Sequence, residues 1–130
     1  MKIALVIPGG VDRSGTERVI PALLALITRL ASQHELHVYA LQQEEAAGHW
    51  RLCGAHIHNI GIPHTRRRAV RAICAEHRMA PFQLVQSIWS GSCGLIAVVA
   101  ARFLRVPGLV HLTGGELCAM HAITYGGRLT

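Results

Sequence analysis

Apolar residues along the chain occur in two kinds of run that alternate with each other. Short runs without helical spacing predict strands at 2–7, 34–41, 55–60, 82–89 and 109–112. Apolar residues three or four positions apart predict helices at 16–31, 65–79 and 95–104. This succession favours the α/β class, with an open, doubly wound, mostly parallel Rossmann-like sheet. We expect about five strands in the order 3-2-1-4-5, numbered along the chain.

Local signals refine the boundaries of these elements. Ser14 and Glu17 have the spacing of a capping box for the first helix. Pro21 falls a turn inside that helix, so it should kink the helix or delay its regular start. Residues 42–51 are polar and predict a connection, and 91–94 predict a turn.

Three turns should meet at one edge of the predicted sheet. Ligands of such sheets bind outside the carboxyl ends of the strands, where the strand order reverses. The turns at that point are rich in Gly, Ser and Thr; they are Pro8–Gly15, Trp89–Gly94 and Thr113–Glu116. A glycine-rich turn that leads into a helix points backbone N–H groups at an anion. The pattern therefore predicts an anion-binding rim.

The first turn does not match the two commonest phosphate-binding motifs. The spacing of Gly10 and Gly15 suits a P-loop, but Thr16 and Glu17 replace the required Lys-Ser/Thr pair. The dinucleotide motif G-x-G-x-x-G is also missing, which disfavours a redox enzyme. The second turn, SGSCG, departs from the hydrolase motif G-x-S-x-G at its first position, so a hydrolase stays a minor alternative.

Composition indicates a globular domain that binds an anionic partner. Half of the 130 residues are hydrophobic, 15% are charged, and the net charge is +6. Arg66, Arg67, Arg68 and Arg71 cluster at the start of the second helix. This cluster is either a solvated face or a contact for a phosphorylated lipid or sugar acceptor or a membrane surface. Only 5% of residues are aromatic, so we expect no nucleic-acid partner.

Neither the apolar runs nor the metal-binding residue types change this picture. No apolar run approaches the ~20 residues of a membrane span. The apolar stretch at the N-terminus is too short for a secretory signal. A cytoplasmic location follows, with peripheral contact to the inner face of the membrane. Four scattered cysteines, at 53, 74, 93 and 118, predict buried thiols. The pairs His34/His37 and His56/His58 lack a Cys or carboxylate at ligand spacing, so no metal site is expected.

Two long segments together resemble one known family. They are SGTERVIPALLALITRLASQHELHVYAL and FQLVQSIWSGSCGLIAVVAARFLRVPGLVHLTGGEL. Both are similar to the N-terminal, acceptor-side domain of GT-B glycosyltransferases of retaining family 4. That family has a G-G-x-E-R-type turn, an H-E-V strand, an F-D-V-V-H-x-H strand and a strand ending in H-G-x-D-L. The resemblance covers nearly the whole chain.

The resemblance implies transfer of a sugar from a nucleotide-sugar donor to a saccharide or lipid acceptor, as in cell-envelope polysaccharide synthesis. It implies no metal or other cofactor. The implied contacts with the donor diphosphate are Gly10, Gly15 and Thr16, and those with the acceptor are Trp89, Ser90 and Ser92. Thr113 and Glu116 are the implied catalytic residues, and Gly114 lines the reacting sugar beside them. Thr113 stands where the family usually has His, which is a departure from the family pattern.

The resemblance also implies that 1–130 is a single, incomplete domain whose nucleotide-sugar domain is absent. Such a chain should be inactive alone, because the family's reaction occurs between two domains. It should also expose an apolar sheet edge or helix face and form a homodimer. The alternative is a non-catalytic, Rossmann-like module that binds phosphate or a nucleotide.

Overall fold

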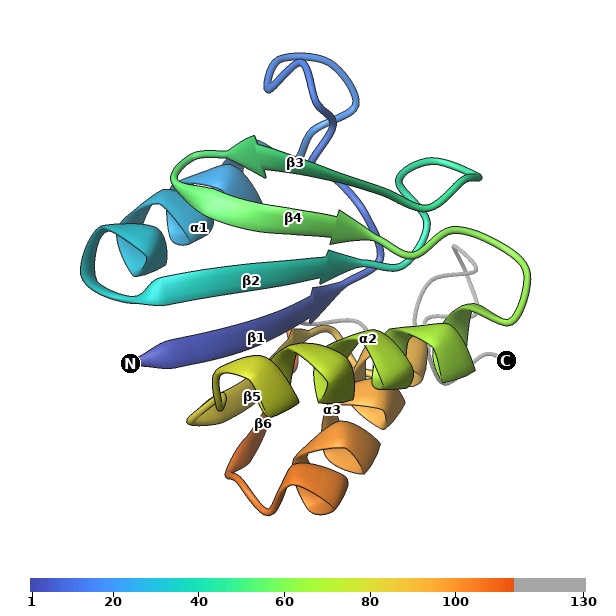
Figure 1. Cartoon of the computed structure of the whole chain (residues 1–130). Helices are drawn as coiled ribbons and strands as arrows, with labels where there is room; N and C mark the ends of the chain where they lie inside the picture. The colour runs from blue at the N-terminus through green and yellow to red at the C-terminus, as the bar shows by residue number, and fades with distance from the viewer. Residues whose placement is uncertain (114–130) are drawn as a thin grey trace, which may run out of the picture.

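The computed structural model describes residues 1–113, which fold into one sheet with helices on both faces (Figure 1). The strands are β1 (Lys2–Ile7), β2 (Glu35–Ala40), β3 (Gly48–Leu52), β4 (Ala55–Asn59), β5 (Leu84–Ile88) and β6 (Gly108–His111). The helices are α1 (Pro21–Gln33), α2 (Thr65–Met79) and α3 (Gly91–Leu104).

The sheet has the order β3-β4-β2-β1-β5-β6. All neighbouring strands are parallel except β3 and β4. The five predicted strands correspond to β1, β2, β4, β5 and β6, and their predicted order is confirmed. The prediction was about five strands, and the described residues form six.

The additional strand, β3, overlaps the end of the stretch 42–51, for which the sequence predicts a connection. Cys53 and Gly54 form a tight turn with φ of 53° and 83°, which lets β3 fold back antiparallel on β4. Trp50 is buried opposite Ile57. Trp50 is the only residue of this short edge strand that is fully buried, and Leu52 on the same face is half-buried, so the alternation is too weak to predict a strand.

β1 is the centre of the structure, because both of its faces are buried. Ile3, Leu5 and Ile7 point to the face covered by α1. Ala4 and Val6 point to the opposite face, where α2 and α3 pack (Figure 1). This two-sided burial explains the continuous apolar run of the strand.

Two helices begin at other residues than predicted. α1 begins at Pro21 and not at 16. Proline suits the first position of a helix because the N–H group that it lacks would have no partner within the helix there. Ser14 Oγ does accept a hydrogen bond from the Glu17 N–H at 3.0 Å, but in a loop and not at a helix start. α3 begins at Gly91, so the predicted turn 91–94 is its first turn.

The cysteine prediction holds for one thiol of the three that the structure describes. Cys93 is buried, and burial raises the pKa of its thiol to about 11. Cys53 and Cys74 are half-buried, so the prediction is wrong for them, and Cys118 lies outside the described residues. Within residues 1–113, no helix has the length and apolar character needed to cross a bilayer.

An apolar surface lies on α3 and β6. Leu95, Val98 and Phe103 on α3 and Leu109 on β6 are each about half exposed or more. β6 is the outer strand on this side of the sheet as far as the described residues go. These residues form an exposed apolar surface within the described part of the chain, while homodimer formation through it stays a prediction.

Candidate functional site

The loop between β1 and α1 is held closed by contacts within the chain. The backbone N–H groups of Gly10 and Val11 both donate to Oε1 of Gln43, at 2.7 and 2.9 Å. The Gly15 N–H donates to the Asp12 carbonyl oxygen at 3.0 Å. These two N–H groups therefore already have an acceptor, and an anion could bind them only by displacing the Gln43 side chain.

Thr16, the third residue predicted to contact a diphosphate, lies in the exposed part of this loop. Its N–H donates to Ser14 Oγ at 3.3 Å. A bridge between Val11 and Val19 closes the base of the loop. The three predicted diphosphate contacts therefore lie in one loop, but each N–H already has a partner within the chain.

A side chain of β3 and an ion pair within the loop itself fix this loop in position. Trp50 donates from its indole nitrogen to the Val11 carbonyl oxygen at 3.1 Å. Arg18 bonds the Asp12 carboxylate. Hydrogen bonds from Ser14, assisted by Arg18, hold the pKa of Asp12 below its usual value. The loop is therefore preorganised by a carboxylate that stays ionised at neutral pH.

A basic pocket of about 440 Å³ opens beyond the carboxyl end of β2. Its lining residues come from the end of β2 and from the first turns of two helices; they include Leu41, Gln42, Thr65, Arg66, Arg67 and Ser92. The Arg66 side chain donates from Nε to Ser92 Oγ at 3.0 Å. The pocket therefore joins two of the predicted anion-binding arginines to a predicted acceptor contact.

The helix starts at this pocket add to its positive potential. α2 begins at Thr65 and α3 at Gly91, and neither N-cap residue, His64 or Ser90, makes a side-chain cap. The N–H groups of a helix's first turn have no partner within the helix and carry partial positive charge. Two uncapped helix starts and two arginines make this pocket suited to an anion.

The other two predicted arginines face a different place. Arg68 and Arg71 line a second pocket, of about 450 Å³, together with His58 and Asn59 of β4. Arg68 also donates to the Pro63 carbonyl oxygen at 3.1 Å. The cluster predicted as one anionic contact is thus divided between two pockets.

Trp89 and Thr113 meet in a third, apolar pocket. This cavity of about 270 Å³ lies between α1 and the ends of β5 and β6, and both residues line it with Ile20 and Leu23. Trp89 has φ of 71°, an unusual backbone conformation for a bulky residue. Its N–H donates to the His111 carbonyl oxygen at 2.8 Å, which ties it to β6.

The remaining predicted positions are only partly described. Ser90 is the residue before α3, at the rim between Trp89 and Ser92. Gly114 and Glu116 lie outside the described residues, so the predicted catalytic pair is represented by Thr113 alone. The structure brings together Arg66, Arg67 and Ser92 in one pocket.

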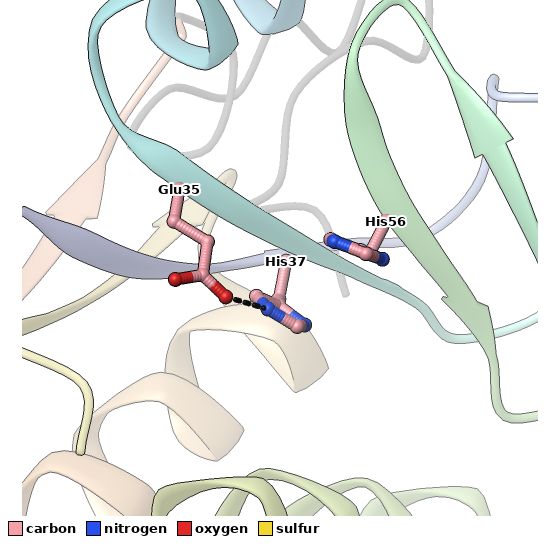
Figure 2. Close-up of side chains that lie close together, drawn as sticks. All are labelled: Glu35, His37 and His56. Atoms are coloured by element: carbon pink, nitrogen blue, oxygen red, sulfur yellow. Dashed lines mark hydrogen bonds and ion pairs between the residues drawn. The ribbon is translucent and has the colours of Figure 1, made fainter. Parts of the chain in front are cut away.

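One cluster was missed by the prediction from sequence. Glu35, His37 and His56 come together on one face of the sheet (Figure 2). The parallel register of β2 and β4 places His37 beside His56. The spacing of histidines along the chain does not reveal this neighbourhood, because it depends on strand pairing.

Comparison with models of protein families and with curated proteins found no match to the chain. The resemblance to GT-B glycosyltransferases therefore stays a prediction.

Proposed function

We propose that this chain is the acceptor-side domain of a GT-B glycosyltransferase, and that its basic pocket binds the phosphate of a phosphorylated sugar or lipid acceptor. The observation that carries the proposal is the hydrogen bond from Arg66 to Ser92. It joins a residue predicted to bind an anion to a residue predicted to contact the acceptor.

The sheet supports this proposal. Its strand order reverses between β1 and β5, and ligands of doubly wound sheets bind beyond that point. The Gly10 loop follows β1, and the Ser90–Ser92 segment follows β5. A donor at the loop and an acceptor at the pocket would lie on neighbouring parts of one rim, as sugar transfer requires.

The chemistry of the pocket supports a phosphorylated acceptor over a neutral one. Guanidinium groups bind phosphate through charge-assisted hydrogen bonds, which are stronger than those to a neutral hydroxyl. The side chains of Arg66 and Arg67 are exposed at the pocket, so a phosphate reaches them without rearrangement of the core.

The second candidate is a module that binds phosphate or a nucleotide without catalysis. The residue at position 113 favours it, because a threonine hydroxyl cannot replace the acid–base chemistry of the His usual in the resembling family. Such a module needs only one anion site, whereas a transferase domain needs places for both donor and acceptor.

NMR titration separates the two candidates. A hexose 1-phosphate should shift backbone signals at 66–67 and 90–92, whereas the unphosphorylated hexose should not. A nucleotide-sugar should then shift signals in the loop at 10–16 without displacing the hexose 1-phosphate. Competition between the two ligands for one site would support the simple module. Absence of shifts along the whole rim would contradict both candidates.

A further inference from the structure

Four histidines lie on the same face of the sheet, on three adjacent strands. His37 belongs to β2, His56 and His58 to β4, and His49 to β3. The register pairs His37 with His56, and His58 with His49. Glu35, the first residue of β2, lies beside them. Glu35, His37 and His56 lie toward the amino ends of β2 and β4, whereas His58 lies next to the last residue of β4.

His37 is fixed at both ring nitrogens. Its Nε2 lies 3.0 Å from Oε1 of Glu35, and its Nδ1 lies 2.9 Å from Nε2 of His58 (Figure 2 shows the first contact). The Nε2 atom of His58 is placed to accept a hydrogen bond from the Nδ1–H group of His37. The orientation of the His37 ring is thereby set.

The geometry points to a binding site for a divalent transition metal, with Zn²⁺ as the best match, formed by Glu35, His37 and His56. The ligand atoms of these three side chains all lie within 4.8 Å of one another. Two ligands of a tetrahedral zinc ion, each about 2.0 Å from the metal, are about 3.3 Å apart. Only a small convergence of the three side chains is therefore needed.

Of the two outer ligands, His56 is held at Nε2 by a hydrogen bond from Nη1 of Arg51 at 3.1 Å, so it must give up this bond or bind the ion through Nδ1. The Glu35 side chain is 55% exposed and His56 is half-buried, whereas His37 is buried. The rings of His37 and His56 are nearly parallel, at 14°, so His56 must turn to direct a nitrogen at the shared ion. The exposed side of the cluster also provides the path by which an ion enters.

The surroundings of His37 match those of a metal ligand. Zinc-bound histidines usually donate their other ring N–H to a neighbouring acceptor, and His58 Nε2 fills that role here. The positive charge of Lys2 is paired with Glu76 at 2.7 Å, which reduces its repulsion of an ion. Two histidines and one carboxylate form the three-residue donor set of a zinc site with an open fourth position.

Isothermal titration with Zn²⁺, on the chain without a histidine tag, tests the inference, together with the visible spectrum of bound Co²⁺. We expect one ion per chain and the intense visible bands of four-coordinate Co²⁺, without the near-ultraviolet band of thiolate ligation. Glu35→Gln and His56→Gln should each weaken Zn²⁺ binding at least about tenfold. Loss of a residue that only hydrogen-bonds a metal ligand already costs about tenfold or more in metal affinity, so loss of a ligand should cost at least as much.

His49→Gln is the matched control, because His49 stacks on His56 at 5.8 Å but lies outside the three ligands. It should leave the dissociation constant for Zn²⁺ unchanged. Equal weakening by His49→Gln would show a diffuse histidine surface and overturn the three-ligand site. Binding unaffected by Glu35→Gln, or no binding of Zn²⁺, would overturn it as well. Glu35→Gln changes an exposed side chain, so it keeps the test valid if His56→Gln fails to fold.

Discussion

Nε of Arg66 lies 3.0 Å from Oγ of Ser92 and donates a hydrogen bond to it. The bond connects the first turn of α2 with the first turn of α3, two segments that are 26 residues apart in the sequence. It forms one wall of the basic pocket. The contact explains how a cluster of arginines and a serine-rich turn, recognised separately in the sequence, form one site.

Gln43→Ala should destabilise the fold by about 1–3 kcal/mol, because it leaves the N–H groups of Gly10 and Val11 without their acceptor. The free energy of unfolding, from urea denaturation, measures this effect. Gln42→Ala is the control, since the neighbouring Gln42 side chain is exposed. Equal losses in the two variants would show that the Gln43 amide does not hold the loop.

Gly10→Ala should destabilise the protein more than Gly91→Ala. Both glycines have positive φ, at 86° and 65°, so alanine is strained at either position. A Cβ at Gly10 would also lie 2.8 Å from the Ile20 side chain, whereas a Cβ at Gly91 meets no atom within 4 Å. Thermal unfolding of the two variants compares the costs. A larger loss for Gly91→Ala would contradict the close approach of Ile20 to Gly10.

Asp12 should contribute to stability at neutral pH and lose that contribution in acid. Its pKa is lowered on folding from the ordinary value of 3.8, mainly by hydrogen bonds from Ser14 and then by Arg18. The contribution is therefore complete well above pH 3.8 and disappears as the pH falls through the folded-state pKa.

The measurement is urea denaturation of the protein and of Asp12→Asn between pH 7 and pH 2. The difference in stability between them should shrink with falling pH. Glu17→Gln, on the same loop, controls for the loss of one negative charge. A difference that stays constant over this range would show that the Asp12 charge does not support the loop.

The sheet could be predicted well from the sequence because its central strands are strongly patterned. Ile3 to Ile7 are buried on both faces, and a short apolar run of this kind is typical of a parallel strand covered by helices. α2 was predicted with the bounds that the structure has, since Gly61 and Pro63 precede it and Pro81 follows it. β3 was missed because Trp50 is the single large apolar residue that it buries.

The contacts within the candidate sites were harder to predict from the sequence than the fold was. The division of the arginines follows from their helical positions, because Arg66 and Arg67 reach the pocket near Ser92 while Arg71 lies a turn further along. His37 lies beside His56 because of the register in which β2 pairs with β4. The pattern of apolar residues in the two strands does not determine which residue of one strand pairs with which residue of the other.

The central claim is that the pocket at Arg66, Arg67 and Ser92 recognises a phosphorylated acceptor. Isothermal titration of a hexose 1-phosphate into two double variants tests it most directly. Arg66→Gln with Arg67→Gln removes the pocket's charges, and Arg68→Gln with Arg71→Gln removes two charges from the other pocket.

The two double variants have the same net charge, so a general loss of electrostatic attraction cancels between them. We predict at least about tenfold weaker binding for the first variant, because a hydrogen bond to a charged group contributes about 1.5 kcal/mol or more, and little change for the second. Equal weakening in both variants, or full binding by the first, would contradict the account.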